Sequence, residues 1–275
     1  LLNTMPLKIA IPNKGRLMEE TVDLLRGVGL RVPRSTDRTL IATINGGKYQ
    51  ILFTRAADIP EFVEIGAADA GITGRDLVEE TGCKVDKLLD LKYGQCRLVG
   101  AAPEHSKISS MSTIPAGARV ATAFPNLTRR HFEKAKKKVV VVPVSGACEI
   151  TPSIGVADLI VDLTQTGSTL KQNHLVELDI VPESWSIFIA GSTLKGEARQ
   201  QAEDLAHAFD SVENALGKRY LMANVPEAKV AVVAKLIPGL KSPTVMSLAE
   251  RGLVAVHAVV DEGDINALLP RLKKE

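Results

Sequence analysis

Short apolar runs alternate with helix-like patterns along the first two-thirds of the chain. The run Leu7 to Ile11 predicts a buried strand, and the polar turn Pro12 to Arg16 leads from it into a segment with apolar residues at helical spacing. Leu40 to Ile44 and Tyr49 to Thr54 flank the turn sequence Asn45 to Lys48 and predict a hairpin. This alternation is typical of an α/β fold. Further strands are expected at Asp69–Ile72, Arg97–Ala102, Arg119–Ala123, Val139–Val144, Leu159–Asp162, Val176–Val181 and Trp185–Ala190.

The pattern changes after a long helical segment, Gly196 to Leu216. Arg219 to Asn224 and Leu253 to Val260 predict strands, and each is followed by a helical pattern, at Pro226 to Leu236 and Ile265 to Lys274. The order β-α-β-α indicates a small α+β module of the ferredoxin-like type without its final strand. We therefore expect a second, smaller domain, with its last strand missing from this chain.

The composition is that of an ordinary globular protein. Hydrophobic residues make up 45% and charged residues 24% of the chain, and aromatic residues only 4%, which predicts an aliphatic core. The formal net charge of +2 is too small to indicate a nucleic-acid-binding surface. We interpret the local basic cluster, Lys134 and Lys136 to Lys138, as the solvated end of a helix. Nucleic acid is therefore not expected as a partner.

No membrane partner is expected either. No segment approaches the roughly 20 apolar residues that a membrane-spanning helix needs. Leu1 to Lys8 lacks the basic start and long apolar core of a signal peptide. The three cysteines, Cys83, Cys96 and Cys148, have no metal-ligand spacing and are expected to be buried, which fits a reducing compartment. These features predict a cytoplasmic protein.

The segment from Asp158 to Leu170 carries the richest chemistry. An apolar strand is predicted to end at Asp162, and a helix to begin just after Thr166-Gly167-Ser168-Thr169. Backbone N–H groups at a helix start favour an anion, glycine permits close approach, and the hydroxyl groups add donors. With Asp162 to accept bonds from ribose hydroxyls, the segment suits a sugar 5-phosphate. It equally suits a Ser/Thr-rich turn with a helix N-cap. It is neither a Walker loop nor a dinucleotide fingerprint, since the lysine and the three-glycine spacing are absent.

Several blocks, taken together, resemble the ATP phosphoribosyltransferase family. The signature comprises Glu149, Gly155, Ala157, Ile160, Asp162, Thr166-Gly167 and Thr169-Leu170. Further blocks follow the family order at Lys14 to Arg16, Arg55 to Pro60, Gly66 to Gly74 and Gly94 to Leu98. The run Gly239 to Val245 is similar to the long-form members, which carry a C-terminal regulatory domain. The resemblance thus covers nearly the whole chain.

The resemblance implies a two-lobed α/β fold like that of type II periplasmic binding proteins. Residues 1–96 with 184–210 would form one lobe, 97–183 the other, and 211–275 the regulatory domain. It also implies transfer of the phosphoribosyl group of 5-phosphoribosyl-1-pyrophosphate to N1 of the adenine of ATP, the first step of histidine biosynthesis. Histidine and AMP are the implied inhibitors, Mg²⁺ the cofactor, and a homo-oligomer of dimers and hexamers the assembly.

The chemistry assigns roles to the matching residues. As pyrophosphate departs, C1 of the ribose becomes cationic, so that the enzyme must mainly align two polyanions and stabilise charge. Lys14, Arg16 and Arg55 follow predicted strand ends, and we expect them to contact the pyrophosphate or the ATP phosphates. Glu149 and Asp162 are candidates for the ribose hydroxyls or for Mg²⁺. The 5-phosphate is expected at the hydroxyl-rich segment of Thr164, Thr166, Gly167, Ser168 and Thr169.

Other positions keep two interpretations. Asp69 and Thr73 lie in a glycine-rich turn and frame the nucleotide, or Asp69 simply caps the turn. Ser242-Pro243-Thr244 is expected to form a turn, and by resemblance Ser242 and Thr244 would help to hold histidine. Asp76 is expected to be a helix-start carboxylate, and no histidine is assigned to catalysis or metal. A two-lobed binding or regulatory protein without catalysis is the alternative to the enzyme.

Overall fold

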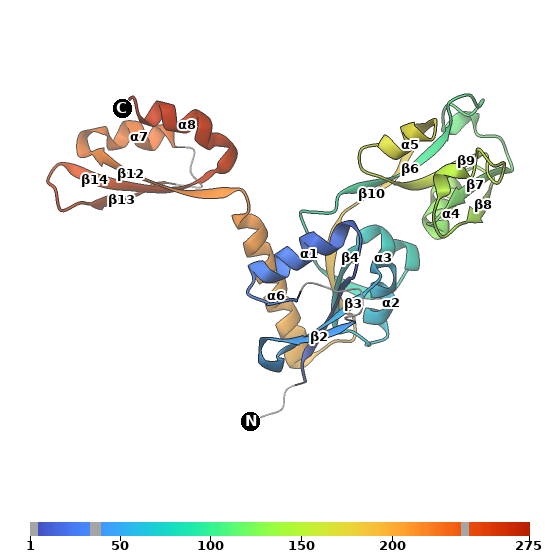
Figure 1. Cartoon of the computed structure of the whole chain (residues 1–275), viewed down its shortest axis with the longest axis horizontal. Helices are drawn as coiled ribbons and strands as arrows, with labels where there is room; N and C mark the ends of the chain where they lie inside the picture. Colours follow the sequence, from blue (N-terminus) through green and yellow to red (C-terminus); the bar gives the residue numbers. More distant parts are fainter. Residues whose placement is uncertain (1–4, 34–39, 238–241) are drawn as a thin grey trace. The chain divides into compact units, whose positions relative to one another are not determined.

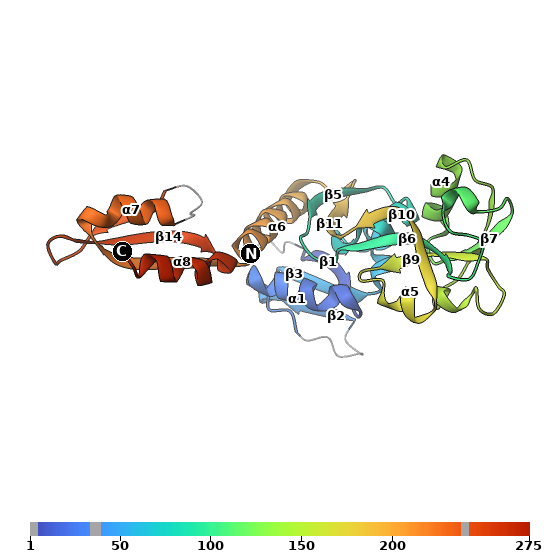
Figure 2. The same cartoon turned by 90° about the horizontal axis from the view of Figure 1, so that it is seen from above.

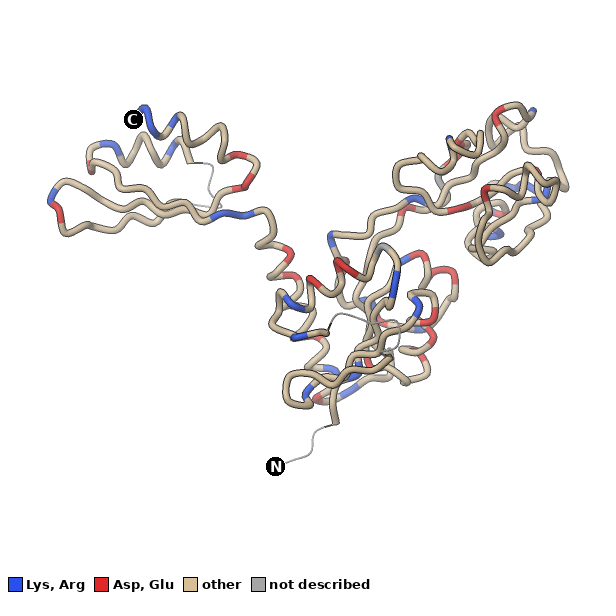
Figure 3. Tube along the Cα trace, viewed as in Figure 1, with Lys and Arg blue, Asp and Glu red and all other residues tan. Residues whose placement is uncertain are grey.

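The computed structural model describes residues 5–33, 40–237 and 242–275. The chain divides into two compact units, Leu1–Asp210 and Ser211–Glu275 (Figure 1). The part of the family-like run that covers Gly239 to Lys241 lies outside the described residues. Within the described ranges, no helix has the length and apolar character needed to cross a membrane. Lys and Arg are interspersed with Asp and Glu along the trace, in keeping with the small net charge (Figure 3).

A six-stranded sheet organises the first lobe, which we define as this sheet and its helices. Its order is β2-β3-β1-β4-β11-β5. The central strand β1 is parallel to β3 and β4, while β2 and β11 run antiparallel to their neighbours. The predicted hairpin is therefore confirmed. The strands are β1 (Leu7–Pro12), β2 (Ile41–Ile44), β3 (Tyr49–Thr54), β4 (Ala70–Gly74), β5 (Val85–Asp90) and β11 (Ser186–Gly191). The helices are α1 (Arg16–Gly27), α2 (Ile59–Glu64), α3 (Arg75–Thr81) and α6 (Gly196–Ala215).

A five-stranded sheet, in the order β10-β6-β9-β7-β8, organises the second lobe. Its two faces carry separate hydrophobic cores, one around Leu98, Val120 and Phe132 and the other around Val99 and Ile160. The basic cluster of the sequence follows the end of the helix α4, as expected. The strands are β6 (Cys96–Pro103), β7 (Ala118–Thr122), β8 (Val139–Pro143), β9 (Leu159–Thr164) and β10 (Leu175–Ser184), and the helices are α4 (Pro125–Lys134) and α5 (Ser168–Gln172).

The chain passes between the two sheets at two adjacent points. β6 begins at Cys96 and β10 ends at Ser184, and these two residues are cross-strand partners. β6 and β10 run side by side away from the first lobe (Figures 1 and 2). Trp185, the only tryptophan of the sequence, lies at this crossing, where its indole N–H donates to Asp90 Oδ1 at 2.8 Å.

The second unit contains a three-stranded antiparallel sheet in the order β12-β14-β13. The helices α7 and α8 contribute Val233 and Leu268 to one core with the strands, on one face of this sheet. The elements are β12 (Lys218–Pro226), α7 (Val230–Leu236), β13 (Thr244–Ser247), β14 (Leu253–Asp261) and α8 (Ile265–Leu272). Their order, β-α-β-β-α, is that of the first five elements of a ferredoxin-like unit.

The strand β13 corrects the sequence interpretation. Thr244 is not part of a turn but opens β13, where it is the cross-strand partner of His257. The segment is only four residues long and exposed throughout, so its sequence carries no apolar alternation. Antiparallel pairing with β14, the next strand in the chain, makes it a strand.

Candidate functional site

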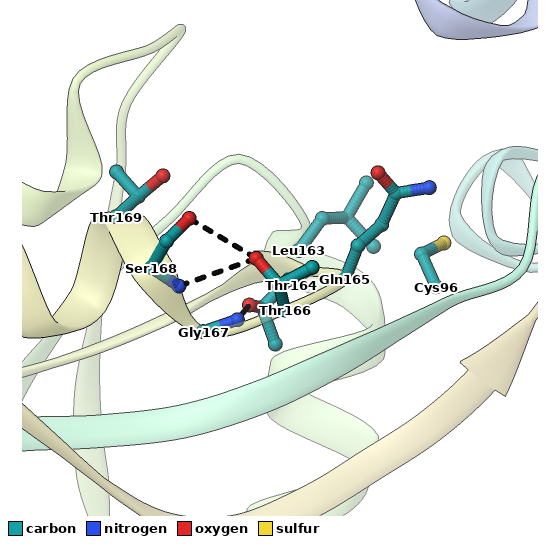
Figure 4. Close-up of a pocket in the computed structure, with 8 residues that line it drawn as sticks. All are labelled: Cys96, Leu163, Thr164, Gln165, Thr166, Gly167, Ser168 and Thr169. Carbon is teal, nitrogen blue, oxygen red and sulfur yellow. Dashed lines mark hydrogen bonds between the residues drawn. The ribbon is translucent and has the colours of Figure 1, made fainter.

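A pocket of about 340 Å³ lies at the turn between β9 and α5. Figure 4 shows the hydroxyl side chains of Thr166, Ser168 and Thr169 grouped at the start of α5. The segment predicted to hold a sugar phosphate therefore lines a cavity. The lining residues are Cys96, Leu163, Thr164, Gln165, Thr166, Gly167, Ser168 and Thr169.

The turn is held in shape by its own hydroxyl groups. The N–H of Gly167 donates to Thr164 Oγ1 at 2.9 Å, and Thr166 Oγ1 donates to Ser168 Oγ at 3.0 Å. Gly167 is the N-cap of α5 and has φ 73°, in the left-handed region that favours glycine. The first turn of a helix leaves N–H groups without intrahelical acceptors. The pocket thus combines backbone N–H groups and hydroxyl donors, a donor set suited to a phosphate.

Asp162 lies inside β9 rather than at its end. The strand continues to Thr164, so the prediction that it ends at Asp162 was wrong. Cross-strand pairing with β6 extends to Thr164, which is the partner of Arg97, and this pairing accounts for the longer strand. Asp162 Oδ1 accepts a bond from the N–H of Leu163 at 2.7 Å.

Asp162 and Glu149 are electrostatic neighbours. Burial raises the pKa of the Asp162 carboxyl, and the charge of Glu149 raises it further, while the Leu163 N–H and the Cys148 thiol lower it. Burial, followed by the nearby Asp162 carboxylate, raises the pKa of Cys148 to about 12, so the thiol remains protonated and donates to Asp162. The fold therefore brings together the carboxylates of Glu149 and Asp162, which belong to different elements, with the Cys148 thiol beside them.

The strand ends of the first lobe bring two of the predicted cations to one edge. Pro12 and Thr54 are register partners in the parallel pair β1–β3, and the N–H of Asn13 donates to the carbonyl of Thr54 at 2.8 Å. Lys14 and Arg55 follow these positions directly, and both are exposed. Among the described residues, neither makes an ion pair. Arg16 is the first residue of α1, which follows β1, so its backbone lies at the same edge of the sheet.

Thr73 and Asp69 occupy opposite ends of β4. Thr73 is fully buried, and its Oγ1 donates to the carbonyl of Ala56 at 2.7 Å, which fastens the segment after Arg55. Asp69 precedes β4, and its Oδ2 accepts from the N–H of Lys8 at 2.8 Å, near the start of β1. This bond favours a structural role for Asp69, because it places the carboxylate at the amino ends of the strands rather than at their carboxyl ends.

Sequence reasoning missed three pocket residues, Cys96, Leu163 and Gln165, and the partial exposure of one cysteine. Cys96 was interpreted as a structural cysteine, yet it is both buried and part of the pocket lining. Gln165 lines the same pocket, and its Nε2 donates to the carbonyl of Gln95 at 3.2 Å. The family-like block Gly94 to Leu98 was the available signal for Cys96, and the segment Asp158 to Leu170 was the signal for Gln165. Cys83 is only partly buried, against the expectation for all three thiols.

The part of the chain that the structure describes holds no metal centre built from protein groups alone. Within the described residues, no three side chains of His, Cys, Asp or Glu are grouped to hold a metal ion. Glu149 and Asp162 remain as a pair. A magnesium ion commonly binds through one or two carboxylates and completes its shell with substrate phosphate oxygens and water. The donor set thus fits a metal that binds together with a phosphorylated substrate.

Comparison with known proteins gives a consistent picture. The family model described as ATP phosphoribosyltransferase matches residues 55–211, and that described as "HisG, C-terminal domain" matches residues 215–275. The ATP phosphoribosyltransferase of Methanosarcina mazei is 45% identical over 274 residues, with 98% of this chain and 94% of the relative covered. That of Gemmatimonas aurantiaca is 48% identical over 275 residues, with 97% and 94% covered.

Solved structures agree with the sequence comparisons. A chain of the ATP phosphoribosyl transferase (HisG:HisZ) complex from Thermotoga maritima is 30% identical and superposes with a TM-score of 0.66, covering 76% of this chain and 98% of that one. A putative L-cystine ABC transporter protein from Listeria monocytogenes is 14% identical with a TM-score of 0.52, covering 76% and 90%, and shares the fold alone. The predicted two-lobed α/β fold with a small C-terminal domain is confirmed.

Proposed function

This chain belongs to the ATP phosphoribosyltransferase family, in its long form, and from that premise we propose where its substrates bind. It transfers the phosphoribosyl group of 5-phosphoribosyl-1-pyrophosphate to N1 of the adenine of ATP and releases pyrophosphate, the first step of histidine biosynthesis. The observation that carries the site proposal is the pocket at residues 163–169.

In our proposal the 5-phosphate of phosphoribosyl pyrophosphate binds in this pocket. Its oxygens would accept bonds from first-turn N–H groups of α5 and from the hydroxyls of Thr166, Ser168 and Thr169. Thr164 takes part indirectly, because its Oγ1 holds the N–H of Gly167. The left-handed backbone at Gly167 leaves open space around its Cα, which lets a phosphate approach closely.

The ribose and the metal are assigned to the carboxylates of Asp162, within β9, and of Glu149, which precedes that strand in the chain. Asp162 and Glu149 are proposed to accept bonds from the ribose hydroxyls, or to hold the divalent ion on which this family generally depends. We propose that this ion is Mg²⁺, which when bound supplies positive charge to the leaving pyrophosphate. The Cys148 thiol beside Asp162 lowers the pKa of that carboxyl and so offsets part of the effect of burial.

We assign the binding of the remaining negatively charged substrate groups to cations of the first lobe. The carboxyl ends of β1 and β3 are followed by Lys14, Arg16 and Arg55, and α/β proteins bind ligands at this edge of the sheet. We propose that these three side chains contact the pyrophosphate or the ATP phosphates, and that Thr73 fixes the backbone beside Arg55 through its bond to Ala56. Catalysis then consists of aligning two anionic substrates and stabilising charge on the departing group.

A direct assay tests the reaction and its metal dependence. Mixing the protein with ATP, phosphoribosyl pyrophosphate and Mg²⁺ is expected to form phosphoribosyl-ATP, followed by its raised ultraviolet absorbance. A chelator in excess over Mg²⁺ is expected to abolish the signal, and added Mg²⁺ to restore it, because the pyrophosphate charge is then no longer neutralised. Product formation at full rate in chelator would contradict the proposed metal role, and no product under any condition would contradict the reaction.

The second unit is proposed to be a regulatory domain that binds histidine, with AMP as a further inhibitor. Ser242 and Thr244 precede and open β13, and both are exposed. Their hydroxyls are available to a polar ligand. We further propose that the protein is cytoplasmic and forms homo-oligomers, dimers that assemble into hexamers.

Replacing Thr244 by valine is expected to raise the histidine concentration for half-inhibition at least about fivefold, since one hydrogen bond to a charged ligand is worth roughly 1.5 kcal/mol. Turnover without histidine should not change. Ser247→Ala, at the other end of β13, is the matched control and should leave inhibition unaltered. Equal sensitivity of the Thr244 variant and the parent protein would place the inhibitor elsewhere.

A further inference from the structure

Helix α3 contacts both lobes, although it follows β4 of the first sheet in the chain. Val78 packs against the core of the first lobe that includes Ile59 and Ile189. The preceding residue, Leu77, packs against the core of the second lobe that includes Leu98 and Phe132. One short helix thus presents adjacent side chains to two separate cores.

The far end of α3 caps a helix of the second lobe. Glu80 Oε1 accepts from the N–H of Asn126 and Glu80 Oε2 from the N–H of Leu127, both at 2.8 Å. These N–H groups belong to the first turn of α4, where a helix has no acceptors of its own and carries partial positive charge. The N-cap residue of α4, Phe124, makes no side-chain capping bond. The Glu80 carboxylate of the first lobe therefore accepts the hydrogen bonds that an N-cap side chain of α4 would otherwise accept.

The same contact is reinforced in the reverse direction. Asn126 Nδ2 donates to the backbone carbonyl of Glu80 at 2.9 Å, and the Arg130 guanidinium donates to that of Glu79. These carbonyls lie in the last turn of α3, which lacks intrahelical donors. Each helix therefore satisfies terminal backbone groups of the other.

The near end of α3 is fixed at the point where the chain crosses between the sheets. Ser184 Oγ donates to Asp76 Oδ1 at 2.6 Å and accepts from the N–H of Asp76 at 3.0 Å, and all these atoms are buried. The Arg75 guanidinium stacks on the Trp185 ring at 4.7 Å. Helix α3 is thus anchored at the crossing by its first turn and on the second lobe by its last.

We propose that the α3–α4 contact is an interlobe latch, and that Glu80 is its positioning residue. By holding the first turn of α4, Glu80 sets the orientation of the second lobe relative to the first. It thereby aligns the pocket at residues 163–169 with the cations at the ends of β1 and β3. The alignment step rests on the proposed function, which places the two substrates on groups from both lobes.

Amide exchange tests the latch itself. In Glu80→Ala, the amides of Asn126 and Leu127 should exchange at least about fivefold faster than in the parent protein, because a lost helix cap is worth roughly 1 kcal/mol. Glu79→Ala is the matched control, since its carboxylate pairs with Arg75 inside α3 and does not reach the second lobe. Exchange that is unchanged in Glu80→Ala, or equally faster in both variants, would overturn the latch. Should Glu80→Ala fail to fold, Glu80→Gln, which keeps one acceptor oxygen, takes its place.

Kinetics test the positioning role. Glu80→Ala should lower kcat at least about fivefold, while the dissociation constant of each substrate measured alone stays within about twofold, because each lobe retains its own binding groups. Faster exchange with unchanged kcat would overturn the positioning role, and so would a rise in the dissociation constants that accounts for the whole loss. Failure of the substrate assignments would instead appear as normal kinetics in pocket and Arg55 variants, with the exchange result unaffected.

Discussion

Gly167→Val is expected to raise the Michaelis constant for phosphoribosyl pyrophosphate at least about tenfold, equivalent to about 1.4 kcal/mol of binding free energy. Two effects add. A β-branched residue is strained at φ 73°, by roughly 1–2 kcal/mol, which loosens the turn that Thr164 and Thr166 hold. The new side chain also enters space that is empty of protein atoms and is proposed to receive the 5-phosphate. Steady-state kinetics with each substrate varied in turn measure the effect.

The control for Gly167→Val carries the same backbone strain away from the pocket. Gly117 has φ 82°, lies in a surface turn before β7 of the same lobe, and likewise has no atoms near an added Cβ. Gly117→Val should destabilise the protein to a similar degree and leave the Michaelis constant for phosphoribosyl pyrophosphate unchanged. An effect of Gly167→Val on ATP alone, or an equal effect of both variants, would contradict the phosphate assignment.

Local sequence patterns were sufficient for most of the fold. β1 follows from the apolar run at Leu7, and the β2–β3 hairpin from the turn sequence between two apolar runs. The long helix α6 also follows from its apolar spacing. In each case the element's own apolar residues recur at the spacing that its secondary structure requires, so that a local pattern carries the information.

Two of the missed features, the strand β5 and the end of β9, depend on partners remote in sequence. β5 (Val85–Asp90) lies at the edge of the first sheet and carries three charged residues among its six, which hides any apolar alternation. Its pairing with β11 bridges about a hundred positions in the chain and cannot be inferred from local spacing. The extension of β9 beyond Asp162 has the same cause, since its partner strand β6 continues alongside it.

The candidate site likewise contains residues that the local sequence predicts and contacts that only the folded chain shows. Apart from Cys96, the residues that line the pocket at the start of α5 are contiguous in sequence, and their hydroxyl groups and glycine indicate a phosphate-binding turn. By contrast, the bond from Thr73 to Ala56 and the contact of Cys148 with Asp162 join separate segments. Their residue types have no special spacing, so only the folded chain reveals that one fastens the Arg55 segment and the other a candidate ligand.

Arg55→Ala is expected to lower kcat by about tenfold or more, corresponding to at least about 1.4 kcal/mol of transition-state stabilisation. Arg55 is exposed at the carboxyl end of β3, and among the described residues it has no ion-pair partner to compete with a phosphate. The backbone on both sides is already ordered: its own carbonyl accepts from the N–H of Asp58 at 3.0 Å, and that of Ala56 accepts from Thr73. The backbone that carries the guanidinium is therefore already ordered, which favours charge stabilisation in the transition state.

Two further variants separate that role from a general charge effect. Arg55→Lys should recover only part of the lost turnover, because an ammonium keeps the charge but not the bidentate geometry that suits pyrophosphate oxygens. Arg251→Ala removes an exposed arginine from a turn of the second unit and should leave kcat unchanged. Normal kinetics of Arg55→Ala would remove Arg55 from the active site. An equal loss of kcat in Arg251→Ala would mean that Arg55 only attracts anionic substrates at long range, an effect that added salt would screen.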